Sequence, residues 1–240
     1  MSKSNQISIE NDFFYLSVFN KLHLTKTRRE HFAKLLSVYH KTSKILTFIP
    51  GVCAFSLCNS LALRTCNETS DIDLFIILKK ESFFTTRLLI IAIFNLFRLR
   101  PKVCLSFFIS NQALNLDNIR LENDIYFSHW LDSLSFYTSD IDLINQFNTL
   151  NNSKSTICDQ FKFKNNICLF ESLLKRFQLK RANKKQSKLQ LSYGVIINSD
   201  MLKFHHRDIR KKFNPAFIRQ YDAFLQGNRV KTYQQSLQEE

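Results

Sequence analysis

The sequence contains few of the residues that interrupt regular structure. It has three glycines and three prolines among 240 residues, well below average usage. This scarcity excludes a collagen-like chain and predicts long helices and strands with few tight turns. Hydrophobic residues make up 45% of the chain, which argues against broad disorder and allows a sizeable core. The length fits one domain with an appendage, or two small domains.

Metal-binding cysteine motifs are lacking as well. No two of the six cysteines have the C-x-x-C spacing of a zinc or thioredoxin site. Cys53, Cys58 and Cys104 lie in apolar runs and are expected to be small core residues. The simplest interpretation is a cytoplasmic protein with reduced thiols.

Long apolar runs are also missing. The first eleven residues are polar and mixed, so we expect no signal peptide. The longest apolar run, residues 88–94, is interrupted at Asn95. It is far shorter than the roughly 20 residues that a membrane span needs. We therefore predict no membrane span and interpret the run as part of a buried helix.

Positive charge is in excess. The chain has 34 Lys and Arg against 20 Asp and Glu, a net charge of +14. This balance predicts attraction to polyanions such as nucleotides, RNA or a membrane surface, with a solvated basic surface as the alternative. Much of the charge lies in an expected helix at residues 168–188, with Phe170 and Phe177 on its expected apolar side. Contact with nucleic-acid phosphates, a solvated face and membrane-surface binding are its three interpretations.

The order of apolar patterns predicts a protein of the α/β (α+β) class. Continuous apolar runs predict buried strands at residues 52–58, 72–78 and 103–109. Helical spacing predicts helices at residues 13–24, 26–46, 83–98, 124–133, 141–147, 168–188 and 207–225, and a hairpin is expected at residues 193–204. Thr25 is the expected N-cap of the second helix. This order predicts a small mixed β-sheet flanked by helices, with additional helices at both ends.

Breaks in composition suggest how the chain is divided. Pro50-Gly51 is the clearest break in the first half, and residues 148–155 read as a polar linker. We predict an N-terminal helical segment at residues 1–48, a core at residues 49–150 and a basic helical extension at residues 151–240.

Two carboxylates mark the most informative part of the chain. Asp71 and Asp73 are separated by one apolar residue, and residues i and i+2 of a strand point to the same face. Adjacent carboxylates repel each other unless a cation lies between them, and Mg²⁺ prefers such oxygen ligands together with substrate phosphates. Ser60 is the expected N-cap of a short helix starting at Leu61 and would hold phosphate there. Arg64, about one turn later, would add a charge-assisted contact.

The segment from Asn59 to Asp73 resembles the nucleotidyltransferase superfamily typified by DNA polymerase beta. That family has Gly-Ser after one strand and two acidic residues flanking an apolar residue on the next. The resemblance implies a nucleotidyltransferase-like core in which Ser60 is the motif serine, and Asp71 and Asp73 are catalytic carboxylates and metal ligands. Asn59 replaces the motif glycine, and asparagine tolerates unusual backbone angles better than most residues. Residues 85–87 and 102–110 also resemble a poorly characterised bacterial branch of predicted nucleotidyltransferases.

The third carboxylate of the family has no match in the chain. Alternation in the strand at residues 103–109 places Cys104, Ser106 and Phe108 on one face. Ser106 is the plainly polar member and is our candidate for the third ligand position, although a hydroxyl is a poor Mg²⁺ ligand beside carboxylates. Arg87, near the start of the preceding helix, is interpreted as a phosphate contact or as a solvated arginine.

The resemblance implies an enzyme that moves a nucleotidyl group from a nucleoside triphosphate to an unknown acceptor with Mg²⁺ (or Mn²⁺). The alternative is a catalytically weak or inactive nucleotide- or RNA-binding module on the same fold. Asp140 and Asp142 repeat the acidic pattern before a helix and are expected to be helix N-terminal charges. His205 and His206, near Asp208, are expected to be surface or packing residues.

Overall fold

The computed structural model describes residues 7–10, 13–16, 22–165, 168, 170–188, 195–204 and 210–225. Its main strands are β3 (Val52–Cys58), β4 (Ile72–Leu78), β5 (Val103–Ser110), β6 (Ser135–Thr138), β7 (Thr156–Gln160), β8 (Val195–Ile197) and β9 (Met201–Phe204). They form one seven-stranded sheet in the order β7-β6-β3-β4-β5-β9-β8. The sheet is mixed, because β4 runs parallel to β5 and antiparallel to β3. The predicted mixed α/β class is confirmed.

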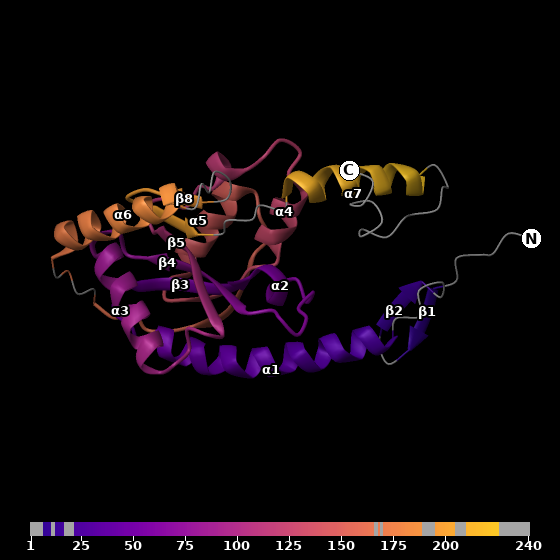
Figure 1. Ribbon diagram of the computed structural model, residues 1–240, viewed down its shortest axis with the longest axis horizontal. Coiled ribbons are helices and arrows are strands. Elements are labelled where there is room, and N and C mark those ends of the chain that lie inside the picture. Colours follow the sequence, from indigo (N-terminus) through magenta and orange to yellow (C-terminus); the bar gives the residue numbers. More distant parts are fainter. Residues whose placement is uncertain are drawn as a thin grey trace, which may run out of the picture.

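The helices are α1 (Leu22–Thr47), α2 (Asn59–Ala62), α3 (Phe83–Leu96), α4 (Ile125–Asp132), α5 (Ile141–Asn151), α6 (Glu171–Lys188) and α7 (Arg210–Leu225), with short 3-10 turns at Lys80–Ser82 and Asp117–Ile119. A separate hairpin pairs β1 (Ile7–Glu10) with β2 (Phe13–Leu16). Figure 1 shows α1 running along one side of the sheet and continuing beyond it toward this hairpin.

Two hydrophobic clusters cover the two faces of the sheet. Side chains of α1, α3 and α6 form the first cluster together with Leu74 and Ile76 of β4. Side chains of α4 and α5 form the second with Phe75 and Ile77. All seven residues of β4 are buried, which explains why its sequence reads as a continuous apolar run rather than an alternating one. By the same alternation, Asp73 belongs to the face of Phe75.

Several predicted elements agree with the structure. Strands at residues 52–58 and 72–78 and the hairpin that joins β8 to β9 are confirmed. The short helix predicted at residues 13–24 is wrong, because Phe13–Leu16 pairs with Ile7–Glu10 as a strand, which suits its aromatic residues. Thr25 lies inside α1 rather than at its N-cap, since α1 begins at Leu22.

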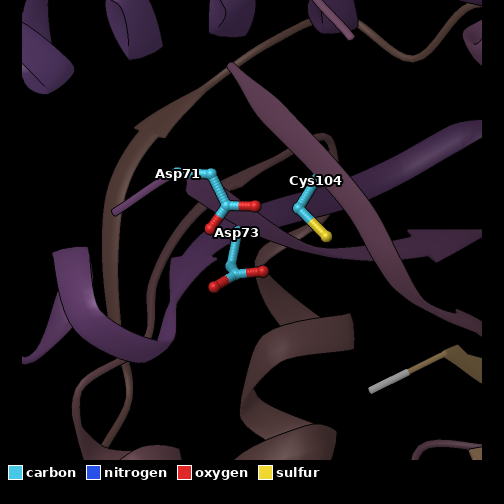
Figure 2. Close-up of side chains that lie close together, drawn as sticks. All are labelled: Asp71, Asp73 and Cys104. Carbon is cyan, nitrogen blue, oxygen red and sulfur yellow. The ribbon is translucent and has the colours of Figure 1, made fainter. Parts of the chain in front are cut away.

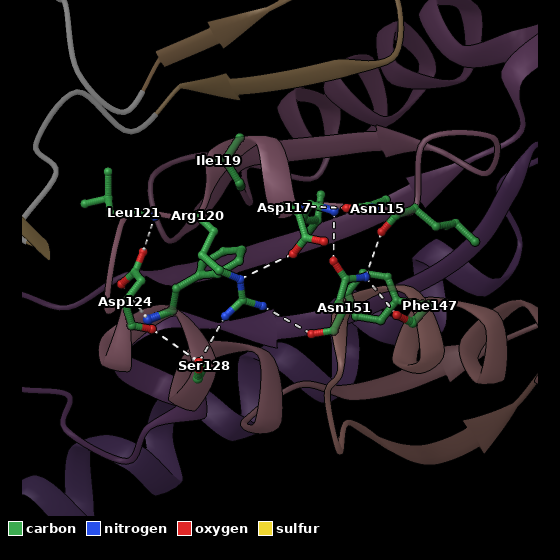
Figure 3. Close-up of polar contacts among 12 residues, drawn as sticks. Asn115, Asp117, Ile119, Arg120, Leu121, Asp124, Ser128, Phe147 and Asn151 are labelled. Carbon is green, nitrogen blue, oxygen red and sulfur yellow. Dashed lines mark hydrogen bonds and ion pairs between the residues drawn. The ribbon is translucent and has the colours of Figure 1, made fainter.

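The predicted polar linker at residues 148–155 is partly helical and well anchored. It begins in α5, whose last residue Asn151 is buried. The Asn151 side chain accepts a hydrogen bond from Leu116 N and donates to Leu114 O, both at 2.8 Å, as the network in Figure 3 shows. The predicted C-terminal extension also contributes strands at both edges of the sheet. At one edge β7 pairs with β6, and toward the other edge β9 pairs with β5.

A buried ion pair attaches α7 to α4. Asp124 is the N-cap of α4 and accepts a hydrogen bond from Phe127 N at 3.1 Å. The same carboxylate accepts from the Arg210 guanidinium at 2.8 Å and from the Asn214 amide at 2.9 Å. Arg210 also donates to Ile119 O at 2.8 Å. Both charges are therefore satisfied in a site where an unpaired charge would be costly.

We predict that Asp124→Ala lowers the free energy of unfolding by about 3–5 kcal/mol, because it leaves the Arg210 charge buried without its partner. Asp117→Ala is the matched control. Asp117 pairs with Arg120 at 3.3 Å but has 59% of its side chain exposed, so its loss should change stability by less than about 1 kcal/mol. Urea denaturation of both variants tests this. Equal effects of the two substitutions would contradict the prediction.

Candidate functional site

Asp71, Asp73 and Cys104 come together at one end of the central strands. Asp71 immediately precedes β4, and Asp73 is paired with Cys58 of β3 on one side and with Cys104 of β5 on the other. One ligand atom of each of Asp71, Asp73 and Cys104 lies within 4.8 Å of the others (Figure 2). Asp71 is exposed, whereas Asp73 is 6% exposed. The predicted juxtaposition of the two carboxylates is confirmed.

The third member of this cluster is a thiol. The pairing of β4 with β5 shifts between Asp73 and Phe75, where Cys104 is followed in register by Phe107. This bulge reverses the alternation of β5, so Phe107 lies on the face of Asp73 while Phe108 packs in the opposite cluster. The predicted common face of Cys104 and Phe108 is therefore wrong. The side chain of Ser106 lies outside the described part of the structure.

The cluster creates a negative electrostatic environment that the neighbouring Cys58 senses. Burial raises the pKa of the Cys58 thiol well above its ordinary value, and the Asp73 carboxylate raises it further. Asp71 acts in the same direction, whereas Lys203 opposes the shift. Because the carboxylates disfavour another negative charge here, the same field favours binding of a cation.

A cavity of about 680 Å³ opens beside Asp73 on the face covered by α4. Its apolar wall consists of aromatic rings from three elements: Phe107, Tyr126, Phe127, Trp130 and Phe213. The Phe127 and Trp130 rings are stacked at 5.6 Å, and Phe107 is stacked on Trp130 at 5.7 Å. These three rings are only 2–4% exposed, whereas Tyr126 and Phe213 are partly exposed. The cavity volume lies in the range of small-molecule sites.

The polar side of the cavity is formed by the segment after β3. Asn59 adopts a left-handed conformation with φ 56°, which asparagine tolerates better than most residues. Its side-chain oxygen accepts a hydrogen bond from Trp130 Nε1 at 3.0 Å. Asn59 therefore makes the turn and also fixes the central ring of the aromatic wall.

Ser60 lines the same cavity but is not an N-cap. The short helix begins at Asn59, with Cys58 at the N-cap position, so Ser60 belongs to the first turn. The reason is the hydrogen bond from Leu63 N to Asn59 O at 2.9 Å, which extends the helix two residues further back than predicted.

The structure does not bring the two predicted phosphate-binding arginines into the cavity lining. The Arg64 guanidinium lies 6.0 Å from the ring centre of Phe32. Arg87 donates to Gln178 Oε1 at 2.6 Å and lies between the Phe108 and Phe204 rings, on the opposite face of the sheet. Burial lowers the pKa of Arg87 to about 10, so Arg87 is a packed residue rather than a solvated one.

Lys203 and Arg210 line the cavity together with His129. Lys203 lies on β9, in register with Phe107, and its ammonium lies 6.0 Å from the centre of that ring. Arg210 is held by Asp124 and lies 5.6 Å from the ring centre of Phe127. Sequence reasoning missed both residues because they follow the acidic pair by more than a hundred positions. The alternation of the predicted hairpin was the one signal available for Lys203.

The aromatic residues at α6 do not lie on the buried side of the helix as predicted. Phe170 and Phe177 were expected on a buried apolar side but are 75% and 57% exposed. The helix is attached through Leu174 and Leu179, which pack against the first cluster, and through polar groups. Glu171 accepts hydrogen bonds from Phe84 N at 2.7 Å and Thr85 N at 2.9 Å. Gln178 donates to Phe84 O at 2.8 Å. Phe177 therefore lies on the outer face beside basic residues such as Arg176 and Arg181.

The remaining sequence patterns either have structural roles or fall outside the residues that the structure describes. Asp140 caps α5 by accepting from Asp142 N at 2.9 Å, which confirms its expected role. His205, His206 and Asp208 fall outside the described residues. All six cysteines are free thiols. Within the described residues, no helix has the length and apolar character needed to cross a membrane.

Comparison of the chain with protein-family models, with curated proteins and with solved structures gave no match. The fold is a mixed α/β arrangement whose seven-stranded sheet carries helices on both faces.

The left-handed conformation of Asn59 leads to a stability prediction. Asn59→Ala and Asn59→Gly both remove the acceptor of the Trp130 hydrogen bond, so the difference between them isolates the backbone conformation. We expect the alanine variant to be less stable by roughly 0.5–1 kcal/mol. This is the cost of a left-handed residue minus the extra chain entropy that glycine loses on folding. Chemical denaturation gives the difference, and a more stable alanine variant would contradict it.

Proposed function

We propose that this protein transfers a nucleotidyl group from a nucleoside triphosphate to an acceptor hydroxyl, with a divalent metal ion, Mg²⁺ or Mn²⁺, held by Asp71 and Asp73. The observation that carries the proposal is the position of the acidic pair beside an aromatic cavity of nucleotide size. The order of elements supports it: β3 leads through α2 to antiparallel β4, and α3 then crosses to parallel β5. In the nucleotidyltransferase superfamily, Gly-Ser follows one strand and two acidic residues lie on the next. Asn59-Ser60 after β3, and Asp71 with Asp73 at the start of β4, resemble this pattern.

The residues around the cavity fit the parts of such a substrate. The base would pack against the partly exposed Tyr126 and Phe213 rings of the wall, and the triphosphate would extend toward Ser60 and Lys203. Two carboxylates provide the oxygen donors that a divalent ion shared with phosphates requires. The bound ion would neutralise charge on the phosphates during transfer.

The proposed reaction is a substitution at the α-phosphorus. The acceptor oxygen forms a bond to this phosphorus, the bond to the oxygen that bridges to the β-phosphate breaks, and pyrophosphate leaves with the electron pair. The acceptor proton passes to solvent or to a carboxylate of the site. The exposed Asp71 is accessible to solvent, whereas the buried Asp73 holds its position through the pairing of β4.

We predict that Asp71→Ala and Asp73→Asn each reduce incorporation of labelled nucleotide by more than about 100-fold. Groups that merely support metal ligands already account for 10–100-fold. The assay combines labelled nucleoside triphosphates, Mg²⁺ or Mn²⁺, and total RNA or protein as acceptor. Asp142→Asn is the matched control, because Asp142 belongs to a second Asp-x-Asp pair whose place is the start of α5. No incorporation by the wild-type protein, or equal incorporation by Asp71→Ala, would defeat the proposal.

The outer face of α6 favours a second candidate function, the binding of RNA without chemistry. Its exposed residues include Arg176, Phe177, Lys180 and Arg181, and Glu171 is the one acidic residue of the helix. Because Glu171 bonds to the start of α3, it does not offset the basic charges of the outer face. Basic side chains would contact phosphates, and the exposed aromatic rings would stack on bases.

We predict that wild-type protein binds a single-stranded RNA oligonucleotide with a steep salt dependence, and that Lys180→Glu/Arg181→Glu weakens binding. For single strands the slope of log affinity against log salt changes by about 0.7 for each phosphate contact, so losing two contacts should flatten it by about 1.4. Lys154→Glu, an exposed charge on the loop before β7, is the control. Binding that ignores salt, or equal effects of both variants, would exclude this surface. Retention of RNA binding by Asp73→Asn would show that the outer face of α6 binds RNA independently of the cavity.

A further inference from the structure

The donor set at the acidic pair does not match the ion that a two-carboxylate motif suggests. Mg²⁺ prefers near-octahedral coordination by oxygen and binds through carboxylates, water and phosphates. Here the third group within 4.8 Å is the Cys104 sulfur. Thiolate ligands favour Zn²⁺ and related transition-metal ions. Two carboxylates alone suit Mg²⁺, but two carboxylates with a thiol do not.

We infer that Asp71, Asp73 and Cys104 form a three-ligand site that binds a Zn²⁺-like ion, such as Zn²⁺ or Co²⁺, in preference to Mg²⁺. Three protein ligands with one open position are the arrangement of catalytic rather than structural zinc sites. The open position is the place for a substrate oxygen beside the cavity that Asp73 lines. The inference rests on the proposed function for its biological meaning, and it replaces the Mg²⁺ or Mn²⁺ proposed there by a Zn²⁺-like ion.

The position of Cys104 is set by the backbone rather than by a flexible side chain. Cys104 is in register with Asp73 on the adjacent parallel strand, next to the bulge of β5. It is partly exposed, so an ion can reach it. The other cysteines differ in this respect: Cys53, Cys58 and Cys66 are buried, whereas Cys158 and Cys168 are exposed and lie outside the cluster. Figure 2 shows the sulfur on the same side as the carboxylates.

The electrostatics of the cluster supply the remaining requirement. A thiol must lose its proton to act as a ligand, and a bound divalent ion removes that proton itself. The resulting thiolate is a softer and stronger donor for a Zn²⁺-like ion than a neutral hydroxyl would be. The proton released on binding goes to solvent, and no oxidation or reduction is involved.

The test is titration of the full chain without a histidine tag, under reducing conditions and without nucleotide, using Co²⁺ as the probe. Wild-type protein should develop a near-ultraviolet cobalt–thiolate charge-transfer band that Zn²⁺ removes and excess Mg²⁺ does not. Cys104→Ser should lose the band, and Asp73→Asn should weaken Co²⁺ binding by about 10–100-fold. Cys158→Ser, which removes an exposed thiol outside the cluster, should retain it.

A second variant addresses selectivity directly. Cys104→Asp replaces the thiol by a carboxylate and should shift the ratio of Zn²⁺ to Mg²⁺ affinity toward Mg²⁺ by about 10–100-fold. The shift can be followed by the fluorescence of Trp130, the one tryptophan of the chain and part of the cavity wall. Thermal unfolding identifies any variant that does not fold. If Cys104→Asp does not fold, the loss of the cobalt–thiolate band in Cys104→Ser tests the inference.

The outcomes separate the ion from the reaction. A band that persists in Cys104→Ser, or that Mg²⁺ removes as readily as Zn²⁺, overturns the inference even if nucleotide incorporation depends on Asp71. A band that follows Cys104 in a protein without incorporation supports the metal site and defeats the proposed function instead.

Discussion

The site depends on the backbone pairing of β4 with its two neighbours. Antiparallel pairing with β3 and parallel pairing with β5 place Cys58, Asp73 and Cys104 in one row across the sheet. Strands in a sheet are separated by about 4.8 Å, so side chains in such a row meet without any long loop to position them. Because all of β4 is buried, slippage of one residue would move Phe75 and Ile77 out of their cluster. The packing of the core therefore fixes the position of Asp73.

The acidic pair at Asp71 and Asp73 lies beside a cavity that is lined by basic residues. The chain has a net charge of +14, yet two carboxylates lie within 4.8 Å of each other at the end of the sheet. A carboxylate in this position is costly unless a cation or hydrogen bonds compensate it. Basic groups such as Lys203 and Arg210 line the adjoining cavity. A pair of carboxylates bordered by Lys203 supports the proposal of a ligand that consists of polyphosphate and a divalent ion.

The C-terminal part of the chain completes what the central strands begin. Phe213 and Arg210 of α7 and Lys203 of β9 line the cavity, although the acids precede them by more than a hundred residues. The Asp124–Arg210 pair connects α7 to α4, the helix that carries Phe127 and Trp130. The α4 and α7 sides of the cavity are therefore held together by one buried contact, which couples the stability of the fold to the shape of the cavity.

The sequence by itself determined the local features: the apolar runs that become β3 and β4, the common direction of Asp71 and Asp73, and the left-handed turn at Asn59. These follow from side-chain alternation and from the conformational preferences of single residues, which act over a few positions. Tertiary structure decided the rest. Pairing of β5 with β4 brought Cys104 to the carboxylates, the docking of α6 left Phe177 exposed, and pairing of β9 with β5 supplied Lys203. Register shifts and contacts between distant segments depend on how whole elements pack, and a local pattern does not contain that information.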